Sequence, residues 1–190
     1  MDEEEPVVVL RLGHRPGRDE RMTTHVGLTA RALGADGVVL AGDGASRAPT
    51  IEDITDRFGG PFDVETTESP RGYIRNWEGA VAHLTMYGLP LQDVEVDLKE
   101  THRSEPLLLV VGAEKVPFDV YEEADWNVAV TNQPHSEVAS LAVCLDRLFE
   151  GRELDREWVD ADRVVRPQET GKRVEAIDAT DGPKAGEHDG

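Results

Sequence analysis

Residues 107–117, LLLVVGAEKVP, and residues 126–148, WNVAVTNQPHSEVASLAVCLDRL, decide how this chain folds. Each stretch begins with a short apolar run that is typical of a buried strand, and each run ends in a polar loop containing glycine or proline. Open α/β sheets bind small ligands in such loops at the carboxyl ends of their strands, because backbone groups there are free of the strand ladder. We therefore predict a ligand site formed by residues 112–117 and 130–137.

The remaining sequence repeats this alternation of apolar runs and amphipathic segments. Strands are predicted at residues 6–12, 36–42, 62–68, 80–88, 107–112 and 126–130. Helices are predicted at residues 46–60, 71–79, 117–124 and 135–151, and from a cap at Thr23 or Thr24 to Gly34. Residues 89–102 fit a helix, or a strand because of their VEV alternation. Strands separated by helices predict an α/β fold, with a mainly parallel sheet sandwiched by helices.

The length of 190 residues suits one α/β domain of ordinary size followed by a tail. We expect the domain to cover residues 1–151 and a C-terminal extension to cover residues 152–175. Residues 176–190 are polar and rich in glycine, so we expect them to be disordered.

The net charge of −19 arises from 39 acidic and 20 basic residues. Such a charge repels nucleic acid and by itself suits a cationic partner. The acidic residues are scattered, however, so we interpret them as a solvated surface adapted to a cytoplasm rich in salt. Residues 6–34 are the exception, because five arginines there face only Asp19 and Glu20. An anionic partner would bind in this segment.

The signatures of several protein classes are missing. No GxxxxGK[ST] loop occurs and no GxGxxG follows the first strand, which argues against NTPases and standard dinucleotide enzymes. No GxSxG elbow supports a hydrolase. Cys144 is the single cysteine, and no Cys/His cluster has the spacing of metal ligands. No apolar run approaches the roughly 18 residues that span a bilayer, so we expect a soluble, cytoplasmic protein without a metal.

The two loops carry groups that suit a compact ligand such as an adenosine. Gly112 leaves backbone amides approachable, and Glu114 can accept from ribose hydroxyls or an amine. Asn132 and Gln133 supply paired donors and acceptors, and residues 135–137 begin the long helix, where free amides favour polar ligand atoms. Each loop alone also has a plain interpretation, a turn in the first case and a helix cap in the second.

Three runs of the sequence, at residues 10–35, 107–117 and 127–141, together resemble the motifs of a known family, and residues 82–88 match as well. The family is the archaeal tRNA 2′-O-methyltransferases that modify the T-loop cytidine at position 56, which are SPOUT methyltransferases. The resemblance implies an α/β knot, with residues of about 80–151 threaded as a deep trefoil. It also implies S-adenosylmethionine as cofactor, tRNA as substrate and a halophilic archaeon as source.

The resemblance assigns roles to residues of this chain. The implied cofactor pocket consists of Leu84, Gly112, Ala113, Glu114, Lys115, Val116, Val130, Thr131, Asn132, Gln133, Pro134, His135, Ser136 and Glu137. The resemblance also implies that four arginines of the first run hold tRNA phosphates, with ordinary loop charge as the alternative: Arg11, Arg15, Arg18 and Arg21.

The catalytic residue implied by the resemblance is Arg31. Because an arginine keeps its proton at neutral pH, Arg31 would position the ribose hydroxyl and the adjacent phosphate rather than act as a base. Relatives in the wider class commonly carry asparagine six residues earlier, where this chain has His25. His25 is either a base or a mere substitute for that asparagine.

Two alternatives to this function stay open. They are methylation of another RNA ribose and non-catalytic RNA binding.

The resemblance further implies a homodimer with the knot at its interface. In the last predicted helix, Val138, Leu141, Leu145 and Leu148 recur at three- and four-residue steps, so one face is apolar and must pack against another surface. A partner protomer is expected to cover that face.

Overall fold

The computed structural model describes residues 5–112 and 115–177, and its centre is a six-stranded sheet in the order β3-β2-β1-β5-β4-β6. All of its strand pairings are parallel. The strands are β1 (Val7–Leu12), β2 (Gly37–Ala41), β3 (Asp63–Thr67), β4 (Ala80–Pro90), β5 (Leu107–Gly112) and β6 (Trp126–Ala129). The predicted α/β fold with a mainly parallel sheet is confirmed.

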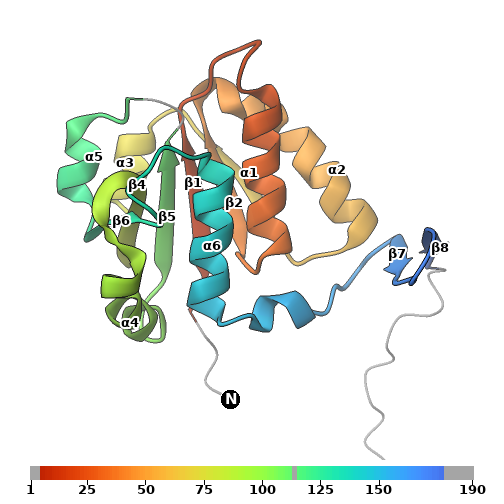
Figure 1. Ribbon diagram of the computed structural model, residues 1–190. Coiled ribbons are helices and arrows are strands. Elements are labelled where there is room, and N and C mark those ends of the chain that lie inside the picture. The colour runs from red at the N-terminus through yellow and green to blue at the C-terminus, as the bar shows by residue number, and fades with distance from the viewer. Residues whose placement is uncertain (1–4, 113–114, 178–190) are drawn as a thin grey trace, which may run out of the picture.

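Helices cover both faces of this sheet (Figure 1). One face carries α1 (Glu20–Ala32), α2 (Ala48–Phe58), α4 (Leu91–His102) and α6 (Glu137–Phe149). The opposite face carries the short helices α3 (Pro70–Arg75) and α5 (Phe118–Glu123). A 3₁₀ turn, η1 (Gly42–Arg47), connects β2 to α2.

The core follows the alternation of strand side chains. In β1, Val7 and Val9 are buried in the cluster beneath α1 and α6, whereas Leu10 and Leu12 are buried in the cluster beneath α3 and α5. Because successive strand residues point to opposite faces, a sheet covered on both sides needs apolar residues at every position, as VVVL supplies.

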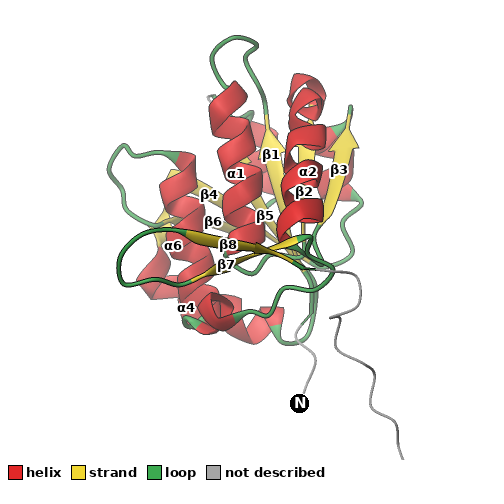
Figure 2. Ribbon diagram, turned by 90° about the vertical axis from the view of Figure 1, so that its right-hand side faces the viewer, coloured by secondary structure: helices red, strands yellow, loops and turns green. Residues whose placement is uncertain are grey.

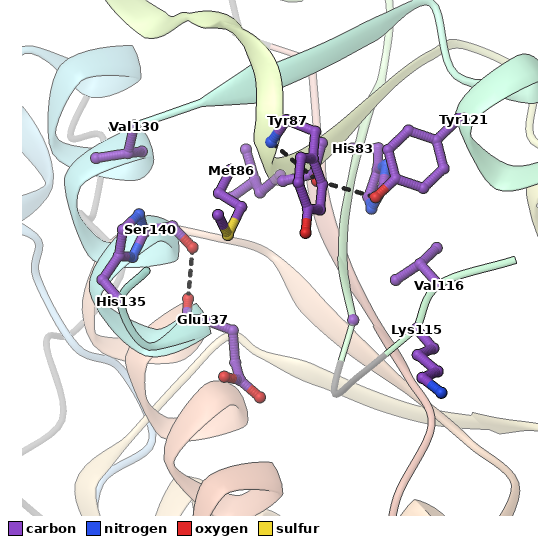
Figure 3. A pocket seen from close by; sticks show the side chains of 13 residues that line it. His83, Met86, Tyr87, Lys115, Val116, Tyr121, Val130, His135, Glu137 and Ser140 are labelled. Carbon is purple, nitrogen blue, oxygen red and sulfur yellow. Dashed lines mark hydrogen bonds between the residues drawn. The ribbon is translucent and has the colours of Figure 1, made fainter. Parts of the chain in front are cut away.

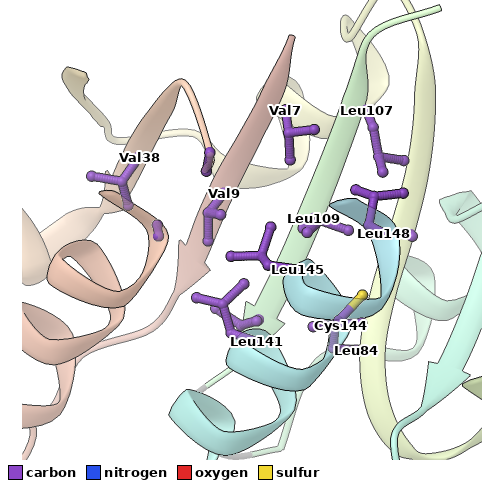
Figure 4. Close-up of a cluster of buried hydrophobic side chains, with 14 of the residues drawn as sticks. Val7, Val9, Val38, Leu84, Leu107, Leu109, Leu141, Cys144, Leu145 and Leu148 are labelled. Atoms are coloured by element: carbon purple, nitrogen blue, oxygen red, sulfur yellow. The ribbon is translucent and has the colours of Figure 1, made fainter. Parts of the chain in front are cut away.

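The apolar face of α6 packs on the sheet of its own chain. Figure 4 shows Leu141, Leu145 and Leu148 directed toward β1 and β5, and each is at most 4% exposed. The expectation that a partner protomer covers this face is therefore wrong, because the sheet already removes these side chains from water.

Two helix boundaries differ from the sequence-based expectation. Helix α1 begins at Glu20, not at a cap on Thr23 or Thr24, because Thr23 is fully buried and its hydroxyl lies 2.8 Å from Nδ1 of His14. Residues 91–102 form helix α4, since Leu91, Val94 and Leu98 are buried on one helical face. The strand alternative for this segment is wrong.

The C-terminal extension forms a short 3₁₀ turn, η2 (Arg152–Asp155), and an antiparallel hairpin of β7 (Arg163–Arg166) and β8 (Arg173–Ala176). An isolated bridge between Gly60 and Val159 ties it to the segment after α2. Figure 2 shows the hairpin outside the main sheet. Most of the tail predicted to be disordered, residues 178–190, lies outside the described residues.

Strand pairing does not test how the chain is threaded, so the trefoil knot stays a prediction.

Among the helices of the described segments, none is long and apolar enough to cross a membrane.

Candidate functional site

A cavity of about 510 Å³ opens at the carboxyl edge of the sheet, where β4, β5 and β6 end. Its size is ordinary for a small-molecule site. Figure 3 shows His83 and Tyr121 on one side of it and His135, Glu137 and Ser140 on the other. The lining consists of His83, Leu84, Thr85, Met86, Tyr87, Gly112, Lys115, Val116, Tyr121, Val130, His135, Glu137 and Ser140.

The first wall comes from an irregularity in β4. Leu84 and Leu89 both pair with Val128 of β6, so the intervening residues 85–88 leave the ladder. A side chain on Gly88 would collide with the backbone of Asn127, which is why this close approach requires glycine. The looped-out backbone of β4 thus forms part of the cavity.

The loop after β6 is fastened to this bulge by one side chain. The amide nitrogen Nδ2 of Asn132 donates to the carbonyl oxygens of Met86 at 2.7 Å and of Gly88 at 3.0 Å. These two bonds satisfy carbonyl groups that the ladder leaves free. Asn132 therefore shapes the cavity from outside it.

Val116, in the segment after β5, lies directly against Gly112 at the end of that strand. A Cβ on Gly112 would collide with the side chain of Val116, so the chain can fold back only at a glycine. Lys115 has a φ of 37°, in the left-handed region that is strained for residues with side chains. This return places Lys115 and Val116 on the cavity wall.

The start of α6 forms the third wall. The hydroxyl of Ser136 caps the helix by accepting from the amide of Ala139 at 3.2 Å. The buried Ser140 donates from Oγ to the carbonyl of Glu137 at 3.0 Å. The capped first turn holds His135 and Glu137 at the cavity.

A buried ion pair lies behind this wall. Arg11, fully buried at the end of β1, places Nη2 2.9 Å from Oε1 of Glu137. Burial lowers the pKa of the Arg11 guanidinium, and the Glu137 carboxylate opposes this shift by favouring the charged form. Arg11 therefore acts within the protein, as the fixed countercharge of a cavity residue.

The structure brings together seven of the predicted cofactor-binding residues: Leu84, Gly112, Lys115, Val116, Val130, His135 and Glu137. Five others are exposed and do not line the cavity: Thr131, Asn132, Gln133, Pro134 and Ser136. Two more, Ala113 and Glu114, lie outside the described residues.

Sequence reasoning missed six lining residues: His83, Thr85, Met86, Tyr87, Tyr121 and Ser140. Four of them belong to the β4 bulge and the strand before it, within the run at residues 82–88 that matches the family. Tyr121 lies on α5, and no local pattern marks it as a cavity residue. Ser140 follows Glu137 by three residues and so shares its helix face.

Arg31 lies far from the cavity. It occupies the last turn of α1, a helix that runs back from the carboxyl edge, so this turn reaches the amino-terminal edge of the sheet. The buried guanidinium donates from Nη2 to the carbonyl of Gly59 and stacks on the Trp158 ring at 4.2 Å. Within one protomer, Arg31 therefore joins α1 to the C-terminal extension and does not reach the cavity, and its catalytic role stays a prediction.

The four arginines expected to hold RNA differ in exposure. Arg11 is buried against Glu137, which contradicts its predicted role. Arg15 donates from its backbone amide, Nε and Nη2 to the carboxylate of Asp19 at 2.9–3.0 Å. These bonds lower the pKa of Asp19 to about 2. Arg18 and Arg21 are exposed.

The remaining candidate, His25, is exposed on α1 and does not line the cavity. In the described part of the chain, no group of three His, Cys, Asp or Glu side chains is arranged to hold a metal ion.

Comparisons with known proteins show the family to which the chain is similar. A family model described as tRNA ribose 2′-O-methyltransferase, aTrm56, matches residues 58–175. The tRNA (cytidine(56)-2′-O)-methyltransferase of Natronomonas pharaonis is 72% identical over 178 residues, which cover 94% of this chain and 99% of that protein. The protein of the same name from Haloarcula marismortui is 74% identical over 174 residues, which cover 92% of this chain and 97% of that protein.

Solved structures with a similar fold are more distant in sequence. The SpoU methyltransferase AviRb from Streptomyces viridochromogenes, in complex with AdoMet, gives a TM-score of 0.53 at 16% identity over 80% of this chain and 59% of that chain. A structure described as an RNA 2′-O ribose methyltransferase gives a TM-score of 0.55 at 16% identity, over 80% of this chain and 58% of that chain. The chain thus spans under two thirds of these two structures, with which it shares the fold.

Proposed function

This chain belongs to the tRNA ribose 2′-O-methyltransferase family described as aTrm56, and we propose that it transfers a methyl group from S-adenosylmethionine to the 2′-oxygen of cytidine 56 in tRNA. The observation that carries the proposal is the similarity to proteins of that name along almost their whole length. The cavity at the carboxyl edge of the sheet supplies a site for the methyl donor.

The residues around the cavity fit S-adenosylmethionine. The space of about 510 Å³ suits a nucleoside-sized ligand, and its lining mixes apolar, aromatic and charged side chains. The wall also contains a buried nitrogen without a hydrogen-bond partner, Nε2 of His83. We assign the cofactor to the seven predicted residues that line the cavity: Leu84, Gly112, Lys115, Val116, Val130, His135 and Glu137.

When bound, S-adenosylmethionine supplies a methyl group on a positively charged sulfur, which the ribose 2′-oxygen receives as the hydroxyl loses its proton. The contribution of the protein is mainly to hold the two reactants in line and to exclude water. The Arg11–Glu137 pair and the Ser136 cap fix the first turn of α6 for this purpose. Within one protomer, Arg31 does not reach these groups, since it is bound to Gly59 and Trp158 at the opposite edge.

The tRNA backbone is assigned to the loop between β1 and α1. Arg18 in this loop and Arg21 in the first turn of α1 are exposed at the same edge of the sheet as the cavity, and a phosphate backbone binds exposed guanidinium groups. Arg15 shapes the loop through Asp19 and joins the contact from its half-buried position.

We also propose a cytoplasmic homodimer. The support is the family resemblance together with large exposed apolar side chains near the cavity, Tyr87 at 77%, Leu89 at 61% and Phe118 at 74%. Light scattering after gel filtration in high salt tests this, and a monomer mass at all protein concentrations would contradict it.

The decisive experiment for the function is transfer of tritiated methyl groups to unmodified tRNA transcripts. Incorporation is expected with cytidine at position 56, and none with a 2′-deoxycytidine at the same place, because the acceptor oxygen is then missing. Equal incorporation into both transcripts would refute ribose methylation at this nucleotide. Incorporation into other RNA but not tRNA would redirect the proposal to another substrate.

A further inference from the structure

A fully buried histidine, His83, lies in the wall of the cavity. It belongs to β4, and its ring meets Tyr121 edge-on with 4.6 Å between ring centroids (Figure 3). Histidine is rarely buried unless its ring nitrogens are hydrogen-bonded. One of the two nitrogens of His83 has a partner, and the other has none in the described structure.

The partnered nitrogen fixes where the ring carries its proton. Asn127 donates from Nδ2 to the carbonyl oxygen of Tyr121 at 2.9 Å, so its amide oxygen must be the atom that lies 2.9 Å from Nδ1 of His83. An amide oxygen only accepts, and Nδ1 therefore carries the hydrogen. In the neutral ring, Nε2 is left with a lone pair and acts as an acceptor.

The ring stays neutral at neutral pH. Burial lowers the pKa of His83, and the hydrogen bond to Asn127 opposes this only in part. The other ionisable groups that line the same cavity are Tyr87, Lys115, Tyr121, His135 and Glu137. Figure 3 places His135 and Glu137 on the side opposite His83, and Glu137 is already paired with Arg11.

These observations define the missing partner. A buried acceptor without a hydrogen bond is unfavourable, and a donor brought by a ligand in the cavity would satisfy it. A neutral acceptor on the side of the cavity opposite Glu137 suits an uncharged hydroxyl or amino group better than an ammonium group, which needs a countercharge. On the proposed cofactor, the uncharged donors all belong to the adenosine part.

We propose that Nε2 of His83 accepts a hydrogen bond from the adenosine part of S-adenosylmethionine and so determines cofactor specificity. The inference rests on the proposed function. A hydroxyl of the substrate ribose offers the same chemistry, but that ribose is held between two phosphates of a folded RNA. Such a ribose can reach the mouth of the cavity more readily than it can reach His83, which is fully buried.

The first test compares cofactor binding by calorimetry in high salt. S-adenosylhomocysteine keeps the adenosine part, and His83→Phe keeps the ring edge beside Tyr121 but removes the acceptor. We expect the dissociation constant of the variant to rise about tenfold, as for a lost hydrogen bond that leaves a donor unpaired. The matched control is His25→Ala, an exposed histidine away from the cavity, which should bind like the wild type.

The second test uses the wild-type protein and therefore does not depend on how the variant folds. With ¹⁵N-labelled histidine, nuclear magnetic resonance should show Nε2 of His83 without a proton. Its resonance should move on addition of S-adenosylhomocysteine or adenosine, and not with methionine. A shift caused by tRNA alone would assign the acceptor to the substrate and overturn the proposal.

The outcomes separate the two levels of inference. The role of His83 alone is overturned if wild type and His83→Phe bind S-adenosylhomocysteine with equal affinity. It is also overturned if the Nε2 resonance does not change when S-adenosylhomocysteine binds. If the wild type binds neither S-adenosylmethionine nor S-adenosylhomocysteine, the proposed function fails and the role of His83 fails with it.

Discussion

Nη2 of Arg11 lies 2.9 Å from Oε1 of Glu137, which joins the end of the first strand to the first turn of the last helix of the sandwich. The Arg11 side chain is fully buried, and the Glu137 side chain is 20% exposed, on the cavity side. A charge in such a place is tolerated only with a partner. The pair therefore holds two distant segments together where the cavity is formed.

Removal of the Glu137 carboxylate should destabilise the protein strongly. In Glu137→Ala, Arg11 keeps a buried charge without a partner, which typically costs about 3–5 kcal/mol of unfolding free energy. Denaturant unfolding at fixed salt measures this. The control is Glu95→Ala, which breaks the exposed pair with Arg147 and should cost less than about 1 kcal/mol. Equal losses in the two variants would contradict the importance of the buried pair.

Arg31→Ala should act on stability and not on the cofactor. The variant loses the bond to the Gly59 carbonyl and the stacking on Trp158, which together should cost about 1–3 kcal/mol. Binding of S-adenosylhomocysteine should change by less than about twofold, since Arg31 does not line the cavity. Trp158→Ala should cost a similar amount, and the two losses should add only in part, because both variants remove the contact between Arg31 and Trp158. Loss of methyl transfer at full stability would restore a catalytic role for Arg31.

Arg18→Ala and Arg21→Ala should weaken tRNA binding in proportion to the phosphates they neutralise. For each lost phosphate contact, the negative slope of log affinity against log salt should become shallower by about 0.7–0.9. The control is Arg103→Ala, an exposed arginine at the end of α4, away from the cavity edge. Filter binding over a range of salt concentrations gives the slopes. Identical slopes for all three variants would remove the loop from the RNA interface.

The Arg15–Asp19 cluster should make the first loop sensitive to acid. The hydrogen bonds from Arg15 lower the pKa of Asp19 from 3.8 to about 2 in the folded state. The carboxylate therefore contributes stability that is fully present above a pH of about 4 and is lost as the pH falls toward 2. Asp19→Asn should be less stable than the wild type at neutral pH, and the difference should vanish near pH 2. A difference that persists unchanged at that pH would argue against the ionised carboxylate as its cause.

Withdrawal of salt should unfold the protein. Its net charge of −19 creates self-repulsion that a short Debye length suppresses. Circular dichroism should show loss of helix on dialysis into low salt, and methyl transfer should persist in molar KCl. A melting temperature that is independent of salt would contradict this account.

The secondary structure follows largely from local sequence. Runs such as VVVL and LLLVV can be buried on both faces of a parallel sheet, and the spacing of Leu141, Leu145 and Leu148 fits only a helix. The start of α1 differs from the expectation because, by sequence, the hydroxyl of Thr23 can serve as a helix cap. The structure shows that this hydroxyl contacts the ring of His14 instead.

The cavity was predicted in outline and incompletely in detail. Strand-end loops could be recognised, so Gly112, Val130 and Glu137 were expected and do line it. The β4 bulge could not, because it arises from the pairing register with β6 and leaves no local periodicity.

The amino-acid sequence alone predicts the succession of strands and helices along the chain, the edge of the sheet where the cavity lies, and the family of the chain. Those properties depend on local periodicity and on motifs of neighbouring residues. The contacts of the charged side chains, by contrast, follow from the three-dimensional packing. Arginines at positions 11, 18 and 31 look alike in sequence, but one is paired inside the protein, one is exposed and one joins α1 to the extension. Their roles depend on partners distant in sequence, such as Glu137 and Trp158, which packing alone brings within reach.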